Sequence, residues 1–363
     1  MGKKRAHGEG TIFQDSRGYW VGEITLPNGK RKRKYSKTQK VVKDWLHIER
    51  EAIKSGLWIG DDRITISELL DRYFNDVALH TLRPKTIESY ESIIRLHLKP
   101  EIGNVKLAAL TPAHLQTLYS KKINSGLSKR SVQYIHAVIH RALKQAMKWG
   151  LTVRNVADAV DAPKVKKTAP TTLTQAQIAT LLDASDGRMK AILILAITTG
   201  MRQGELLGLH WQDISGSEIH VQHTTQTLYK QGIVISEPKT EKGKRSITLP
   251  EIAINALRDC RQVTGDETGL VFHTSTGRPI SARNLIRDFQ AVLEKAGLPH
   301  IRFHDLRHTS ATLLLIAGVH PKVVQERLGH SRIDMTLDTY SHVVPSMQED
   351  AAEKMNKLFV AKV

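Results

Sequence analysis

The start of the chain alternates apolar and polar residues in a way that predicts three short strands followed by a helix. The strand candidates lie in TIFQDSRGYWVGEITLPNGKRKRKYS and are interrupted at 15–18 and 27–29, where Asn-Gly is a strong hairpin signal. A helix is predicted over 38–54, because apolar residues recur there at helical spacing. Its apolar stripe consists of Val41, Val42, Trp45, Ile48 and Ile53.

The next hundred or so residues carry helical periodicity. The predicted helices span 65–74, 84–98, 111–123 and 128–149. Pro84 and Pro112 stand where first-turn prolines belong, and Gly126 and Gly150 mark helix ends. The stretch PKVKKTAP at 163–170 is charged, lacks an apolar period and is bounded by prolines, so it is predicted to be a linker.

From residue 171 onward, helices enclose a strand-rich insert at about 217–249, with β-branched runs at 219–221, 233–235 and 246–249. An amphipathic tail helix is predicted over 346–359. These patterns predict a multidomain fold, mainly α with small β elements. The predicted parts are a three-stranded sheet with one helix at 1–58, a helical domain at 62–163, and an α+β domain with the tail helix at 171–363.

Charge and composition indicate the type of partner and the cellular compartment. The formal net charge of the 363-residue chain is +18 and its pI is near 9.9, a bias that points to nucleic acid as partner ahead of a membrane surface. The single cysteine, Cys260, excludes an intrachain disulfide. No apolar run approaches the length of a membrane span, and no signal peptide is recognisable, so we expect a soluble cytoplasmic protein without membrane contact.

Six residues of the C-terminal half combine positive charge, proton donors and a nucleophile. They occur in TTGMRQGELLGL, EPKTEKGKR, HDLRH and LGHSRIDMTLDTY, and are Arg202, Lys239, His304, Arg307, His330 and Tyr340. Arginine, lysine and histidine side chains can surround one phosphate, and a tyrosine can attack it. Such a set can break a DNA backbone without a metal, so we expect no metal and no other cofactor.

The local spacing supports some of these assignments and leaves others open. Arg202 opens a helix, and Glu205 shares its face and can orient the guanidinium. His304 and Arg307 share a helix face at i, i+3. His304 and His308 also have the i, i+4 spacing of zinc-binding helices, but the flanking arginines repel a cation. The lysine assignment is ambiguous, because Lys242 and Lys244 lie in the same turn as Lys239.

With these motifs, the stretch 171–363 resembles the tyrosine recombinase (lambda-integrase-like) family, and the whole chain resembles phage and integrative-element integrases with an N-terminal arm-binding domain. The resemblance implies a site-specific recombinase that forms a 3′-phosphotyrosyl bond through Tyr340 and conserves bond energy without ATP. It also implies that Lys239 protonates the departing 5′ oxygen, and that Arg202, Arg307 and His330 hold the scissile phosphate. His304 would exchange a proton with the nucleophile, and Glu205 would support Arg202.

The resemblance further implies two DNA-binding regions on double-stranded DNA. The helical domain matches the core-binding domain, whose expected DNA-facing residues are Lys85, Thr86, Lys129, Arg130, Gln133 and His136. The N-terminal domain matches the arm-binding domain, whose expected contacts are Tyr19, Lys30, Arg31, Lys32, Arg33 and Lys34. A homotetramer on DNA is implied, together with DNA-bending and excision proteins and association with the nucleoid. The tail would either fold back on its own domain or dock on a neighbouring subunit, and the resemblance favours docking.

Two other hypotheses compete with recombination. One is a DNA-binding architectural protein that keeps the fold without the chemistry, but the presence of all six catalytic-type residues argues against it. The other is a type IB topoisomerase-like enzyme, which uses related chemistry. The separate arm domain favours recombination, because relaxation of DNA needs no second DNA site.

Overall fold

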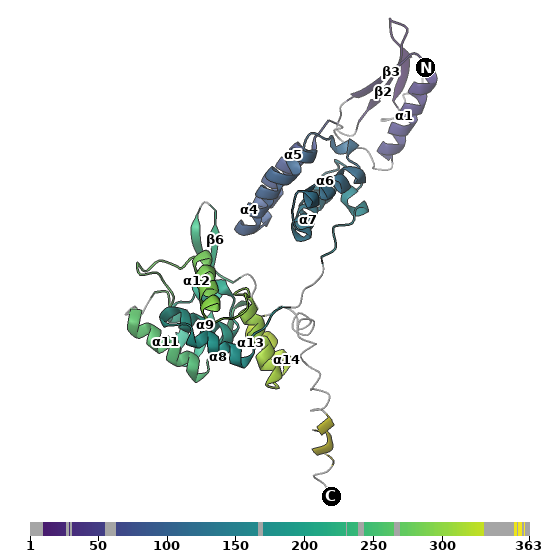
Figure 1. The fold of residues 1–363 in the computed structure, drawn as a ribbon. Coiled ribbons are helices and arrows are strands. Elements are labelled where there is room, and N and C mark those ends of the chain that lie inside the picture. The colour runs from purple at the N-terminus through teal and green to yellow at the C-terminus, as the bar shows by residue number, and fades with distance from the viewer. Residues whose placement is uncertain are drawn as a thin grey trace. The chain divides into compact units, whose positions relative to one another are not determined.

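The protein is described by a computed structural model, which divides the chain into two compact units, Met1–Lys166 and Lys167–Val363 (Figure 1). The residues described are 10–26, 29, 31–54, 63–165, 170–229, 231–238, 243–264, 269–329, 352–353, 355–357 and 359. The boundary between the units lies within the stretch 163–170, where the sequence predicts a linker. The division of the first unit near residue 60 stays a prediction.

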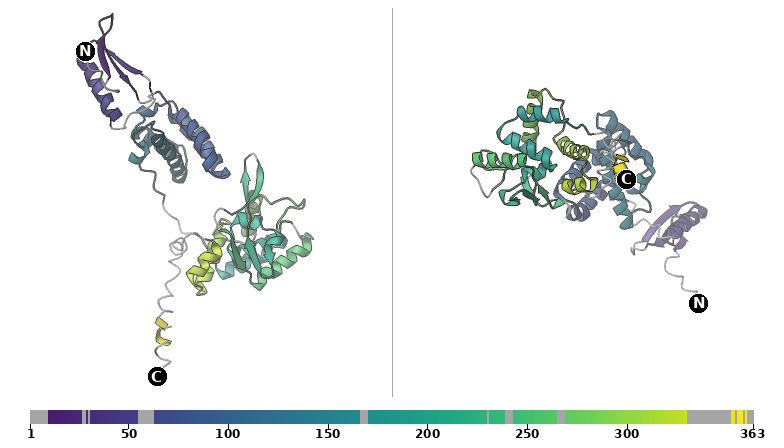
Figure 2. Two further views of the ribbon diagram at one scale, coloured as in Figure 1. Left: turned by 180° about the vertical axis from the view of Figure 1, so that it is seen from behind. Right: turned by 90° about the horizontal axis from the view of Figure 1, so that it is seen from below.

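The N-terminal part of the first unit is an antiparallel sheet in the order β1-β2-β3 with one helix beside it (Figure 2). Its elements are β1 (Thr11–Gln14), β2 (Trp20–Thr25), β3 (Arg31–Ser36) and α1 (Gln39–Lys54). A Cβ on Gly22 would lie 2.7 Å from Val42 of α1, so the glycine allows this close approach of helix and sheet. The predicted stripe is partly wrong, because Val41 and Ile48 are exposed whereas Leu46 is buried.

The rest of the first unit is helical, and its apolar core lies between residues 66 and 160. Its elements are α2 (Ile66–Tyr73), η1 (Phe74–Ala78), α3 (Leu79–Thr81), α4 (Pro84–Ile93), η2 (Ile94–Leu98), α5 (Lys99–Ile102), η3 (Leu107–Ala109), α6 (Pro112–Asn124), α7 (Lys129–Lys148) and η4 (Val156–Ala159). Thr65 and Glu68 form a capping box that begins α2, and Ser128 caps α7. The helix predicted over 84–98 is α4 continued by the π-helical turn η2.

The second unit places helices around two small sheets. Its elements are α8 (Gln175–Asp183), α9 (Gly187–Thr199), α10 (Gln203–Leu207), η5 (Trp211–Asp213), β4 (Ile214–Ser215), β5 (Glu218–Val221), β6 (Thr224–Leu228), β7 (Gly232–Ser236), β8 (Arg245–Thr248), α11 (Glu251–Thr264), α12 (Ala282–Lys295), α13 (Asp305–Ile316) and α14 (Pro321–Leu328). One sheet has the order β4-β5-β8, and β6 and β7 form a separate hairpin. The architecture of both units confirms the predicted fold class.

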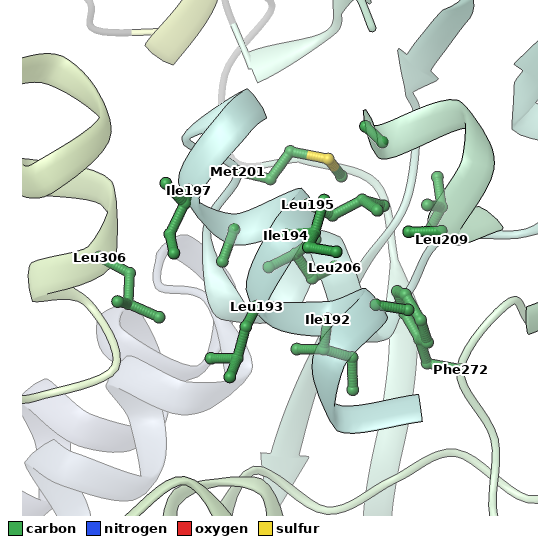
Figure 3. Close-up of a cluster of buried hydrophobic side chains, with 14 of the residues drawn as sticks. Ile192, Leu193, Ile194, Leu195, Ile197, Met201, Leu206, Leu209, Phe272 and Leu306 are labelled. Carbon is green, nitrogen blue, oxygen red and sulfur yellow. The ribbon is translucent and has the colours of Figure 1, made fainter. Parts of the chain in front are cut away.

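Helix α9 lies at the centre of the second unit's apolar core. Every residue from 191 to 197 is buried, as expected for a helix that is apolar all round. Leu306 of α13 lies on one side of α9, and Leu209 and Phe272 lie on the opposite side (Figure 3). The helix ends at Gly200, whose positive φ of 64° is the left-handed conformation that glycine adopts readily.

Two further features of the structure concern the single cysteine and the apolar character of the helices. Cys260 on α11 is buried, its Sγ lies 3.8 Å from the carbonyl oxygen of Val271, and burial raises the pKa of the thiol. In the part of the chain that the structure describes, no helix combines the length and apolar character that crossing a membrane requires.

Candidate active site

Arg202 is the residue that caps α10. Its backbone N–H donates to Oε2 of Glu205 at 2.9 Å, and its guanidinium forms an ion pair with Oε1 of the same carboxylate at 2.7 Å. The guanidinium also donates to the carbonyl oxygen of Gly329 at 3.1 Å. Arg202 is therefore fixed at both ends, by its own helix and by the C-terminal end of α14.

Glu205 joins Arg202 to a second arginine, Arg245, at the start of β8. The carboxylate is 3% exposed and also accepts a hydrogen bond from Arg245 at 2.9 Å. Burial alone would raise the pKa of Glu205. The hydrogen bond and charge of Arg245, with the charge of Arg202, outweigh burial and hold that pKa below its ordinary value. Glu205 is thus a buried carboxylate shared by two arginines.

Arg307 lies on α13 and is held by backbone carbonyls. Its guanidinium donates to the oxygen of Gly200 at 2.7 Å and to the oxygen of Leu328 at 2.6 Å. Arg202 binds the very next carbonyl, that of Gly329. The two predicted phosphate-binding arginines therefore meet at the C-terminal end of α14, where carbonyl groups attract cations.

Two glycines end the helices that meet near these arginines. Gly200 ends α9 and Gly329 ends α14, both with positive φ, of 64° and 67°. A side chain on Gly200 would collide with Leu328 and lie 3.3 Å from the hydroxyl of Ser310. The close approach of α9, α13 and α14 therefore depends on glycine at position 200.

His304 precedes α13 and lies next to Arg307 in the fold, since the Arg307 N–H donates to the His304 carbonyl at 3.1 Å. The residue is exposed, yet the surroundings of the ring lower the pKa of His304 to about 4. The first cause is desolvation of the charged ring, followed by the charges of His308 and Arg307. At neutral pH the imidazole is uncharged and can accept a proton.

The alternative metal site at His304 and His308 gains no support. The two rings lie edge to face with their centroids 5.1 Å apart. Among the described residues, this pair has no third histidine, cysteine or carboxylate that would complete a metal-binding cluster.

Three of the six predicted catalytic residues, Lys239, His330 and Tyr340, lie outside the described residues. Lys242 also lies outside them, whereas Lys244 is described and forms an ion pair with Glu237 at 2.9 Å. His330 follows directly after Gly329, whose carbonyl binds Arg202. The structure thus brings together Arg202, Glu205, His304 and Arg307, and the catalytic roles of all six residues stay predictions.

The predicted arm-binding residues do not form one patch. Gly22 faces α1, and strand alternation and cross-strand pairing place Lys32 and Lys34 on the same face of the sheet as Gly22. Lys32 forms an ion pair with Glu49 of α1 at 2.7 Å. Arg31 and Arg33 lie on the opposite face and pair with Glu23.

The other two predicted arm-binding residues are Tyr19 and Lys30. Tyr19 is 37% exposed, and its N–H donates to the carboxylate of Asp15 at 2.9 Å. Lys30 lies outside the described residues.

The predicted core-binding residues lie at the start of α4 and in the N-terminal half of α7. Lys85, Lys129 and Arg130 are exposed, and Lys85 pairs with Glu88 at 3.0 Å. The other three, Thr86, Gln133 and His136, are partly buried. The side-chain amide of Gln133 donates to the carbonyl of Pro163 at 2.9 Å, and a ring nitrogen of His136 lies 2.9 Å from the hydroxyl of buried Tyr119.

The sequence reasoning did not identify Arg245 and Arg327. Arg245 donates to the Arg327 carbonyl at 2.7 Å, and the Arg327 side chain donates to the carbonyls of Thr198 and Thr248 at 2.9 and 3.0 Å. Arg327 thereby ties α14 to α9 and β8. The only local signal was an arginine at the start of a strand after a basic turn, which is ordinary on a protein surface.

Comparisons with known proteins identify the family of the chain. The model of the phage integrase family matches residues 171–347, and the model of the phage integrase N-terminal SAM-like domain matches residues 65–123. A relative from Caldanaerobacter subterraneus subsp. tengcongensis, named tyrosine recombinase XerC-like, is 30% identical over 369 residues, which cover 92% of this chain and 94% of that protein. The ICEBs1 integrase of Bacillus subtilis is 24% identical, with coverage of 76% and 78%.

Solved structures share the fold. The integrase of the Tn1549 transposon, in complex with transposon right end DNA, superimposes with a TM-score of 0.68 at 23% identity and covers 81% of this chain and 99% of its own. A lambda integrase tetramer bound to a Holliday junction has a TM-score of 0.59 at 21% identity, with coverage of 88% and 95%.

Proposed function

The chain belongs to the phage integrase family of tyrosine recombinases, and we propose that it is an integrase that cuts and rejoins DNA at specific sites to integrate and excise a mobile element. The observation that carries the proposal is the pairing of Arg202 and Arg307 on the consecutive carbonyls of Gly329 and Leu328. Two guanidinium groups fixed side by side suit the two non-bridging oxygens of one phosphate.

The proposed reaction is a transesterification. The hydroxyl oxygen of Tyr340 attacks the scissile phosphorus, and the bond from phosphorus to the 5′ oxygen breaks. The tyrosine proton passes to the neutral ring of His304, whose low pKa keeps it ready to accept. Lys239 gives a proton to the departing 5′ oxygen. The 5′-hydroxyl of another strand then attacks the phosphotyrosyl bond and reverses these transfers.

Charge stabilisation falls to Arg202, Arg307 and His330. Phosphoryl transfer spreads negative charge over the equatorial oxygens, and fixed cationic donors stabilise that charge. Arg307 is 3% exposed, so its position is set by packing before any phosphate arrives. Loss of one such donor would slow cleavage by roughly a hundredfold or more.

DNA would be held by both units. In the second unit the arginine site contacts the scissile phosphate. In the first unit, exposed Lys85, Lys129 and Arg130 at helix starts are the core-binding candidates. On the N-terminal sheet, Arg31 and Arg33 lie on the face opposite α1 and are the arm-binding candidates favoured by the strand register, because a sheet face can enter the major groove.

The proposed assembly on DNA is that of the family. Strand exchange between two duplexes needs four active sites, so the working form is a homotetramer on DNA. The predicted tail helix at 346–359, most of which lies outside the described residues, would dock on a neighbouring subunit. The protein would act in the cytoplasm at the nucleoid, with DNA-bending and excision proteins as accessory partners.

Covalent trapping tests the function. The full chain is incubated with nicked or fragmented host and element DNA, denatured, and the DNA still attached is sequenced. We expect discrete adducts that disappear in Tyr340→Phe and persist in Tyr229→Phe, a matched control at a tyrosine that is 88% exposed. The Tyr340→Phe variant should keep DNA binding, because one hydroxyl contributes little to phosphate contacts.

Three other outcomes would contradict the proposed nucleophile or the proposed function. Adducts that survive in Tyr340→Phe would overturn the choice of nucleophile. Tight, salt-sensitive DNA binding without any adduct would favour an architectural protein. Cleavage that proceeds on a single site, with relaxation of supercoils and no strand exchange, would favour a topoisomerase-like enzyme.

A further inference from the structure

Two histidines and a buried aspartate meet in the second unit, at the turn that follows α10. His210 precedes the turn η5, Asp213 ends it, and His223 lies between β5 and β6. Each residue offers one ligand atom, and the three atoms lie within 4.8 Å of one another. The three side chains therefore converge on one point, although they come from two separate stretches of chain.

The geometry of the cluster is close to that of a metal site. Nδ1 of His223 lies 3.0 Å and Nδ1 of His210 lies 3.8 Å from Oδ2 of Asp213. Neighbouring ligand atoms of a tetrahedral zinc ion with bonds of about 2.0 Å are roughly 3.3 Å apart. Small adjustments of these side chains would thus place all three within bonding distance of one ion.

We propose that His210, Asp213 and His223 bind a divalent transition-metal ion of the Zn²⁺ type, with water completing its shell. Imidazole nitrogens with a single carboxylate suit Zn²⁺ and its chemical neighbours. Ca²⁺ and Mg²⁺ fit less well, because both prefer shells made of oxygen atoms.

The surroundings of the cluster favour a preformed binding site. Asp213 has a side chain that is 2% exposed, whereas those of His210 and His223 are 20% and 28% exposed, so the ion and its water can reach the site from solvent. The carboxylate is also fixed by the His210 backbone N–H at 3.0 Å. Nδ1 of His210 also lies 3.0 Å from the Gly208 carbonyl, so an ion bound at this nitrogen would replace that contact.

The ion would act as a structural link near the arginine site. His223 directly precedes β6, and Thr225 of β6 donates a hydrogen bond to Gly204 of α10 at 3.3 Å. Helix α10 carries Glu205, the carboxylate that orients Arg202. A bound ion would join the start of β6 to the turn after α10 and so stiffen the support of Arg202. It takes no part in the transesterification itself.

Metal titration of the untagged full chain tests the site. Zn²⁺ binding is followed by calorimetry, and Co²⁺ is used as a spectroscopic probe of coordination. The test variants are His210→Gln and His223→Gln; Asp213 is kept because its carboxylate also caps the turn. The matched control is His220→Gln on β5, whose ring contacts Ser246 and lies outside the cluster.

We expect one Zn²⁺ site in the unaltered chain and in His220→Gln, with affinity reduced by at least about a hundredfold in the two test variants. Saturating Zn²⁺ should raise Tm by about 5 to 10 °C in the unaltered chain and in His220→Gln, but not in His210→Gln or His223→Gln. Equal binding by all four folded proteins, or no binding by the unaltered chain, would overturn the proposal. Because no DNA is present, the result is independent of the proposed recombinase activity.

Discussion

At the scale of single residues, the main feature of the candidate site is how its cations are held. Arg202 and Arg245 share the buried carboxylate of Glu205, and the Arg307 guanidinium donates to two backbone carbonyls. Backbone carbonyls carry only partial charge, so they fix the Arg307 guanidinium without neutralising it. The arrangement keeps net positive charge where a phosphate would bind.

Arg245→Ala should weaken both stability and catalysis. The change leaves Glu205 buried with one cation instead of two, and breaking a buried ion pair costs about 3 to 5 kcal/mol. Urea unfolding measures that loss. Among molecules that remain folded, we also expect slower adduct formation, because Arg202 loses the fixed orientation of its partner carboxylate.

A lysine variant and a surface variant sharpen this test. Arg245→Lys keeps the charge but loses the planar fork, so intermediate effects are expected. Arg287→Ala, at a side chain that is 72% exposed, should change stability by less than about 1 kcal/mol. If Arg245→Ala forms adducts at the normal rate, Arg245 has no positioning role.

His304 should titrate at unusually low pH. In the free protein its ring resonances should change with a midpoint near pH 4, which NMR can measure, and His304→Asn identifies the signal. Because the folded pKa lies below the ordinary value of 6.5, the unfolded chain binds more protons between those values. The stability contribution is therefore full above pH 6.5 and is lost as the pH falls toward 4.

The His304→Asn variant should lose this part of the pH dependence of unfolding, although the pKa of His308, which burial also lowers, leaves a remainder. Adding DNA should raise the His304 midpoint, because a nearby phosphate favours the charged ring. A midpoint near 6.5 in the free protein would contradict the expected desolvation.

At the scale of elements, the helical periods of the sequence predict most of the fold. The helices predicted over 65–74, 111–123 and 128–149 differ from α2, α6 and α7 by one residue at each end. Apolar spacing, first-turn prolines and end-marking glycines act locally, so they can be read without tertiary information. The pairing of Arg202 with Arg307 could not be read in this way, because the two residues lie far apart in the sequence and meet only in the folded chain.

The strand-rich insert was only partly predictable. The β-branched runs mark β5, β7 and β8, but β6 was missed because its residues, TTQTL, are mostly polar. Its strand conformation is instead fixed by antiparallel pairing with β7, which the side-chain pattern does not reveal. The predicted apolar stripe of α1 is only partly right: Val42 is buried, whereas Val41 and Ile48 fit a helical period but face solvent.

Gly200→Ala should disturb the junction of α9, α13 and α14. The new Cβ would collide with Leu328 and also strain a backbone with φ of 64°. The strain alone costs about 1 to 2 kcal/mol, and the collision adds roughly 1 to 3 kcal/mol. Chemical denaturation measures the sum. Adduct formation should fall as well, because the Gly200 carbonyl binds Arg307.

Gly297→Ala is the matched control. Its φ of 63° imposes the same strain, but nothing lies within 4 Å of the added Cβ. It should cost only the strain energy and leave adduct formation unchanged. Equal destabilisation by the two substitutions would show that the junction tolerates a side chain at position 200.

At the scale of the whole molecule, each unit buries an apolar core of its own. One core lies between residues 66 and 160, and the other extends from Leu173 to Leu306. Neither core shares a residue with the other, so each unit has the internal packing that an independently stable body needs.

The buried thiol of Cys260 has a practical consequence. Since it is the sole cysteine and burial raises its pKa, little thiolate is exposed to attack by maleimide or disulfide reagents. The natural chain is thus already suited to fluorescent labelling without removal of native thiols. Cysteines introduced at exposed Asp76 and Arg287, one in each unit, would accept a dye pair. Energy transfer between the dyes would then report the distance between the two units in single molecules, with and without DNA.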